Sequence, residues 1–86
     1  MKKIALYGSK NVIHARLRRY RELRKLTQDQ VAAKLQVMGV NIDQQALSRI
    51  ENNQRMVTDY ELACLCRVLQ VSPQDLLADF LNTSEP

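Results

Sequence analysis

Helix-breaking residues are nearly absent from most of this chain. No proline occurs before Pro73, and Gly39 is the single glycine between Asn11 and that proline. Proline and glycine are the strongest interrupters of regular structure, and apolar residues recur here at helical spacing. The pattern therefore favours an all-α domain, with nearly every residue from Asn11 to Leu81 in a helix.

Capping signals divide this stretch into five predicted helices, because a side-chain oxygen at a helix start can accept from the free backbone N–H groups. The predicted helices begin at Asn11, at Thr27 with Gln30, at Asp43, at Thr58 with Glu61, and at Ser72 with Pro73. The first is expected to end near Arg24 or Lys25 and the second near Met38, with Gly39 as its stop. The predicted inward faces carry Ile13, Leu17, Tyr20 and Leu23; Val31, Ala32 and Leu35; Ala46, Leu47 and Ile50; Leu62, Leu65, Cys66 and Leu69; and Leu76, Leu77 and Phe80.

Charge is distributed unevenly along the 86 residues. Residues 1–25 carry nine basic side chains against the single acidic Glu22, whereas residues 26–86 carry four basic and eight acidic side chains. This uneven distribution suggests that one side of the molecule binds a polyanion, and nucleic acid is favoured over an anionic membrane surface. The alternative is a basic face that is only solvated. Because the four aromatic residues are not interleaved with the basic ones as stacking platforms, duplex DNA is favoured over single strands.

Several classes of function are disfavoured by what the sequence lacks. It offers no nucleophile–base pair and no glycine-rich phosphate loop, so we expect no enzyme and no cofactor. His14 is the single histidine, and Cys64 and Cys66 lie two apart in a predicted helix, so neither a metal site nor a disulfide is expected. The apolar run after Lys3 is too short to enter a membrane, and we expect a cytoplasmic protein.

The expected domain organisation has three parts. Residues 1–10 form an N-terminal arm, for which a short strand or a support for a neighbouring element are alternatives. Residues 11–81 form the helical domain, and residues 82–86 form a tail that frays.

From Ala15 to Leu77 the chain resembles the Cro/repressor (XRE-type) helix-turn-helix DNA-binding domain. The resemblance rests on several short motifs in the correct order: Arg16-Leu17 and Arg21, Leu26-Thr27-Gln28, Leu47-Ser48-Arg49-Ile50-Glu51-Asn52, Val57-Thr58 to Leu69, and Val71-Ser72-Pro73-Gln74-Asp75-Leu76-Leu77. It implies a five-helix lambda-repressor-like fold whose third helix reads the major groove of double-stranded DNA.

The resemblance also implies roles for individual residues. Gln44, Gln45 and Arg49 occupy base-facing positions, with an ordinary solvated first turn as the alternative for the two glutamines. Arg21 and Glu51 correspond to a structural ion pair between the first and third helices. Contacts to the DNA backbone are expected from Gln28, Ser48, Asn52, Asn53, Arg55, Arg16 and Lys10. Asn52 is equally suited to forming a turn, and Ser48 to being a small residue without a contact. Arg18, Arg19 and Arg24 are expected to be solvated. Tyr20 and Tyr60 are assigned to the core or its edge.

The chain departs from the family pattern in two places. The connection between helices two and three is lengthened by about five residues, from Gln36 to Ile42, and Val37–Val40 could then serve a partner or complete a larger core. Gln70 replaces a glycine at the end of helix four, which predicts a left-handed non-glycine residue there.

The leading hypothesis is a sequence-specific repressor of bacterial or phage origin that binds DNA as a homodimer. The dimer surface is expected on helix five with Phe80, on Val57–Tyr60 and on the N-terminal arm. The alternative is a protein-interaction adaptor or antitoxin-like partner, which would use Val37–Val40 or helix five.

Overall fold

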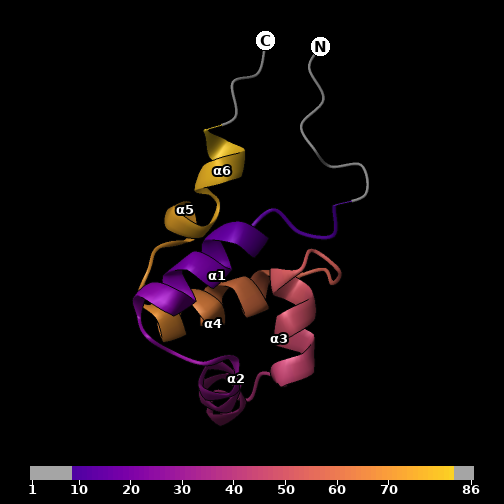
Figure 1. Cartoon of the computed structure of the whole chain (residues 1–86), viewed down its shortest axis with the longest axis vertical. Coiled ribbons are helices and arrows are strands. Elements are labelled where there is room, and N and C mark those ends of the chain that lie inside the picture. The colour runs from indigo at the N-terminus through magenta and orange to yellow at the C-terminus, as the bar shows by residue number, and fades with distance from the viewer. Residues whose placement is uncertain (1–8, 83–86) are drawn as a thin grey trace.

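The structure is a computed structural model that describes residues 9–82. Within that range the chain is all helical and contains no strand, which confirms the predicted fold class (Figure 1). The helices are α1 (His14–Leu23), α2 (Gln28–Val37), α3 (Gln44–Glu51), α4 (Asp59–Leu69), α5 (Pro73–Leu76) and α6 (Ala78–Leu81). The expected strand or arm within residues 1–8 and the tail at 83–86 lie outside the described residues.

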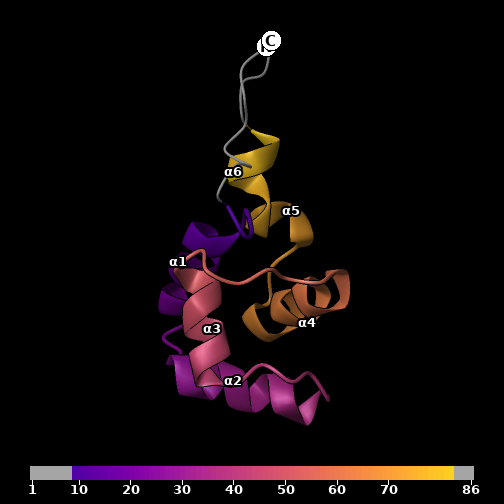
Figure 2. The same cartoon turned by 90° about the vertical axis from the view of Figure 1, so that its right-hand side faces the viewer.

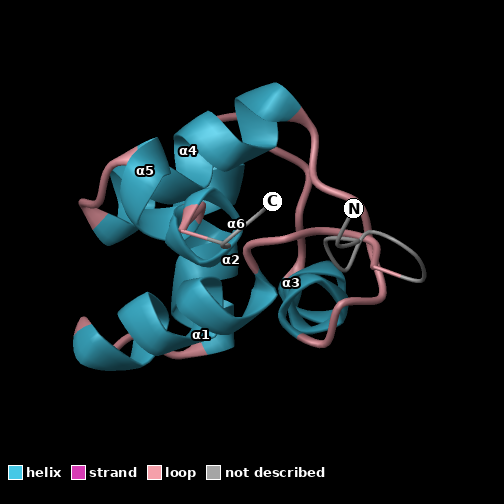
Figure 3. Cartoon of the chain, turned by 90° about the horizontal axis from the view of Figure 1, so that it is seen from above, coloured by secondary structure: helices cyan, strands magenta, loops and turns pink. Residues whose placement is uncertain are grey.

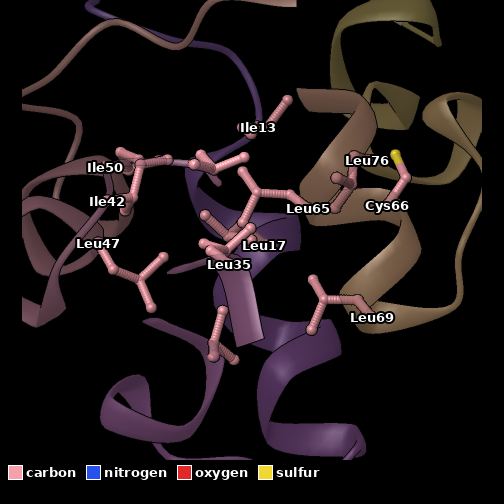
Figure 4. Packing of buried hydrophobic residues seen from close by; sticks show 12 residues of the cluster. Ile13, Leu17, Leu35, Ile42, Leu47, Ile50, Leu65, Cys66, Leu69 and Leu76 are labelled. Atoms are coloured by element: carbon pink, nitrogen blue, oxygen red, sulfur yellow. The ribbon is translucent and has the colours of Figure 1, made fainter. Parts of the chain in front are cut away.

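One apolar core joins the first five helices (Figure 4). Its fully buried side chains come from α1 to α5 and from the connection before α3, and they include Leu17, Val31, Leu35, Ile42, Leu47, Ile50, Leu65, Leu69 and Leu76. Burying a side chain of this size contributes about 1.5–3 kcal/mol relative to leaving it exposed. The helical spacing of the sequence identified all of these residues except Ile42, which lies in the connection before α3.

Most helix starts follow the predicted capping chemistry. Thr27 and Gln30 form a reciprocal capping box on α2, and Thr58 and Glu61 do the same on α4. Asp43 caps α3 by accepting from the backbone N–H of Ala46. These starts are set by residues within one turn of each other, so short-range sequence signals suffice to locate them.

The start of α1 differs from the prediction. The helix begins at His14, and Asn11 does not cap it. The side chain of Asn11 instead donates to the carbonyls of Ile50 and Arg55 in and after α3. The cap was wrongly predicted because Asn11 finds these partners about forty residues away in sequence. Leu23 was also misplaced, since it is 59% exposed in the last turn of α1.

The long connection between α2 and α3 is partly absorbed by the core. Gly39 has φ +82°, and this left-handed turn lets the Val40 N–H donate back to the Leu35 carbonyl. Val40 and Ile42 then bury their side chains, whereas Val37 remains 89% exposed. The connection thus enlarges the core through its second half and leaves only its first half as apolar surface.

The predicted fifth helix is split into two short ones. Ser72 and Asp75 form a capping box on α5, but Leu77 leaves helical geometry with φ −90° and ψ 5° before α6 begins. Tyr60 is 60% exposed in the first turn of α4, so its assignment to the core was wrong, while Tyr20 packs against the core as expected. Gln70 has φ +56° and ψ +50°, which confirms the left-handed residue at the end of α4.

The arrangement leaves α3 at the margin of the molecule. Figures 2 and 3 show α3 beside α1 and α2, while α4 packs against α2 and α5, and α5 against α1. The inner residues Leu47 and Ile50 are fully buried. The opposite side of α3 is consequently free of other described helices.

Candidate nucleic-acid interface

The outer side of α3 carries the residues predicted to read bases. Gln45 and Arg49 lie one helical turn apart and are both exposed, while Gln44 and Ser48 are half-buried. All of the predicted base-facing residues therefore lie on one helix, which the core holds in place through Leu47 and Ile50. The helix is narrow enough to enter the major groove of B-form DNA.

The Gln44 side chain is not free in solution but is tied to α2. Its Nε2 donates to Oε1 of Gln28 at 2.7 Å, and Nε2 of Gln28 donates to Oε1 of Glu51 at 3.0 Å. Gln28 is the first residue of α2, where unpaired backbone N–H groups and the helix dipole favour an anion. The two amides thus connect the start of α2 to the first turn of α3.

Behind these amides lies an ion pair between α1 and α3. Nε of Arg21 donates to Oε2 of Glu51 at 2.6 Å, and a second guanidinium nitrogen donates to Oε1 at 3.1 Å. The side chain of Glu51 is 2% exposed and that of Arg21 is 13% exposed. Because hydrogen bonds from the carboxylate favour the charged guanidinium, they raise the pKa of Arg21.

Asn52 and Ser48 lie together near the C-terminal end of α3. Nδ2 of Asn52 lies 3.4 Å from Oγ of Ser48, and Asn52 follows the last residue of the helix. Asn52 is exposed and Ser48 is half-buried. Their polar groups therefore lie at the C-terminal end of α3, next to the exposed Arg49.

Asn53 has a structural task that the sequence reading did not identify. Its Oδ1 accepts from the backbone N–H groups of Lys10 and Asn11, at 2.8 and 3.2 Å. Its backbone is left-handed, with φ +59°. Together with the bonds from Asn11 to Ile50 and Arg55, these contacts form what we call the asparagine clamp, which consists of Asn11 and Asn53. The clamp holds the exposed Lys10 beside the end of α3.

Arg55 is engaged inside the fold. Its guanidinium donates to both carboxylate oxygens of Glu61, at 3.0 and 3.1 Å, and to the Met56 carbonyl at 2.9 Å. The Glu61 side chain is only 6% exposed, and Arg55 lowers its pKa by stabilising the charged carboxylate. Arg55 therefore braces the loop after α3 against the start of α4, and removing it would strand a buried carboxylate.

Arg16 does not lie with α3. Its Nε donates to Oδ1 of Asp79 on α6 at 3.0 Å, and this bond raises the pKa of Arg16. Figure 1 shows α6 above α1, whereas α3 lies below and to the right of it. The backbone contact expected from Arg16 thus has no support in the geometry.

Arg24 is exposed, as expected, but its guanidinium also binds the end of α4. Its Nε donates to the Leu69 carbonyl at 2.7 Å, and a second nitrogen donates to the Gln70 carbonyl at 3.0 Å. These bonds satisfy carbonyls at the end of α4 that have no partner within the helix. No local signal points to this role, because the contact spans 45 residues of sequence.

The described residues offer no metal site, two free thiols and no membrane-spanning helix. Between residues 9 and 82 no group of three or more His, Cys, Asp or Glu side chains could hold a metal ion. Cys66 is buried and Cys64 is half-buried, and both are free thiols. No described helix combines the length and the apolar character needed to cross a membrane.

Comparison with known proteins gives two findings. Residues 17–76 match the helix-turn-helix family. The restriction-modification controller protein C.AhdI from Aeromonas hydrophila is similar in structure, with a TM-score of 0.65 and 26% sequence identity over 74% of this chain and 86% of that one. None of the curated proteins compared with the chain matches it.

Proposed function

Since the chain belongs to the XRE-type helix-turn-helix family of DNA-binding transcription regulators, we propose that it is a sequence-specific repressor that reads the major groove with α3. The observation that carries this proposal is the outer side of α3. There Gln45 and Arg49 project into solvent from a helix whose inner side is fully buried. Side chains fixed on a rigid element can discriminate between base pairs without a large ordering cost.

The base-reading residues have suitable chemistry. A glutamine amide matches the donor and acceptor of adenine, and an arginine guanidinium matches the two acceptors of guanine. Gln44, Gln45 and Arg49 are proposed for these contacts. Each well-aligned pair of this kind is worth about 1–3 kcal/mol of discrimination.

A second set of residues is proposed to hold the DNA backbone. Gln28 stands at the first turn of α2, where the helix end attracts phosphate. Ser48 lies on α3, Asn52 directly follows it, and the asparagine clamp holds Lys10 beside its end. Three residues are left out of this set, because Arg16 pairs with Asp79 on α6, Asn53 holds the Lys10 backbone and Arg55 holds the buried Glu61 carboxylate.

The test is a titration with duplex DNA selected from a randomised library, at two salt concentrations. We expect affinity to fall steeply with salt, since counterions are released from the phosphates. Arg49→Ala should weaken the selected sequence by about tenfold or more and leave random duplex little changed. The matched control is Arg67→Ala, which removes an equal charge from the last turn of α4. Binding without salt dependence or sequence preference would refute this function and favour a protein-interaction role through the exposed Val37.

The proposed active form is a homodimer on a roughly palindromic site, because one α3 contacts too few base pairs for useful specificity. Its surface is proposed around a hollow of about 370 Å³ lined by residues that include Val57, Leu62 and Leu77. The exposed Met56 and Tyr60 belong to the same stretch of chain, between α3 and the first turn of α4. Sedimentation of the DNA complex should give two chains per site, and one chain per site would exclude the dimer.

A further inference from the structure

A continuous series of side-chain hydrogen bonds leads from the interior to the outer side of α3. Arg21 donates twice to Glu51, Gln28 donates to Glu51, and Gln44 donates to Gln28. The N–O distances along the series run from 2.6 to 3.1 Å. It begins on α1, passes through the buried end of α3 and the start of α2, and ends at the first residue of α3.

The carboxylate of Glu51 gives this series a direction. An ionised carboxylate accepts hydrogen bonds and donates none, so Gln28 must turn its NH₂ group toward Glu51. The carbonyl oxygen of Gln28 then faces Gln44, and Gln44 must turn its own NH₂ group toward Gln28. One N–H of Gln44 is thereby used, while Oε1 and the second N–H stay available for another partner.

This available pair of groups distinguishes the two purines. Adenine presents one donor and one acceptor in the major groove, and both match Oε1 and the remaining N–H of Gln44. Guanine presents two acceptors, one of which would face Oε1. If the amide were reversed, both N–H groups would face the DNA and guanine would be matched instead.

We propose that Glu51, held by Arg21, is a positioning residue for base recognition: through Gln28 it fixes the amide direction of Gln44 and so selects adenine over guanine at one base pair. This inference rests on the proposed function. Neither Glu51 nor Arg21 needs to touch DNA, since both act through Gln28. The base preference at that position is therefore encoded partly in the buried ion pair.

The decisive variant is Gln28→Lys, because lysine donates and cannot accept. Its ammonium group would still donate to Glu51 but would force Gln44 to accept through Oε1. The Gln44→Ala variant first identifies the base pair at which it loses the wild-type preference. The readout is then the affinity for two duplexes that differ only at that base pair, one with A·T and one with G·C. The adenine-to-guanine affinity ratio should fall from about tenfold to below one. Gln36→Lys adds the same charge to an exposed position of α2 and should leave this ratio unchanged.

Two further variants keep the test independent of any one substitution. Gln28→Ala leaves the ion pair intact and should reduce the ratio to about twofold or less, because Gln44 can then turn either way. Glu51→Gln should reduce the ratio in the same way. Its binding is measured below the unfolding temperature of this variant, which circular dichroism determines. If all three variants keep the wild-type ratio, the positioning role is refuted while sequence-specific binding stands. If the wild-type protein shows no sequence preference, the proposed function itself fails.

Discussion

Replacing Asn11 with alanine tests the asparagine clamp, which no local sequence signal announces. The Asn11 side chain accepts from the Ile13 N–H at 3.1 Å and donates to the Ile50 and Arg55 carbonyls at 3.0 and 2.9 Å. Alanine removes all three bonds but keeps the backbone N–H that donates to Asn53. The substitution thus isolates the side chain's contribution to stability.

The expected loss follows from the number and setting of these bonds. Each intramolecular hydrogen bond contributes about 0.5–1.5 kcal/mol net, and a buried group left without a partner costs about 1–3 kcal/mol. All three bonds are part-buried, so we expect Asn11→Ala to lower the free energy of unfolding by about 2–4 kcal/mol. For a domain of this size that lowers the melting temperature by roughly 10–25 °C.

The assay is guanidinium unfolding followed by far-UV circular dichroism. With a slope of about 2 kcal/mol per molar, the midpoint should fall by about 1–2 M. Asn41→Ala, at an exposed position between α2 and α3, is the matched control and should stay within about 0.5 kcal/mol of wild type. An Asn11→Ala midpoint equal to that of the control would show that the clamp does not stabilise the fold.

Two other predictions concern single residues. Because Arg55 lowers the pKa of Glu61 in the folded state, this pair stabilises the protein above the unfolded glutamate pKa of about 4.3 and loses its effect as pH falls below it. Glu61→Gln should therefore lose stability near neutral pH and unfold with a shallower acid dependence in urea titrations between about pH 7 and pH 3; an unchanged dependence would contradict the assignment. Gln70→Gly should raise the melting temperature by about 3–6 °C, since Gln70 has φ +56° and glycine adopts that backbone without strain. Gln36→Gly, within the helical backbone of α2, should lower it, and a rise in both would refute the argument.

The parts of the fold that sequence reasoning located are those whose causes are close together in the chain. The starts of α2, α3 and α4 depend on a cap and its partner three residues later, and both are visible in the sequence. The buried stripe of each of these helices follows from helical periodicity. Even the left-handed Gln70 could be placed, because the family pattern has a glycine there.

The errors arose where a polar side chain finds its partner far away. Asn11 has the character of a helix cap, but its donors reach carbonyls 39 and 44 residues later. Arg24 is exposed, as predicted, but its bond to the end of α4, across 45 residues, was missed. A basic residue looks the same in the sequence whether its partner is a phosphate or a distant carbonyl. The pairing is decided only when the packed helices bring the two groups together.

The split at Leu77 divides the end of the described chain into two segments with different anchorage. The side chain of Leu76 in α5 is fully buried, whereas α6 contains no buried residue. Among its contacts with the rest of the fold, α6 has the surface ion pair between Asp79 and Arg16, which dissolved salt screens. Opening of α6 therefore leaves the apolar interior undisturbed, so this last helix can unfold without the rest of the domain.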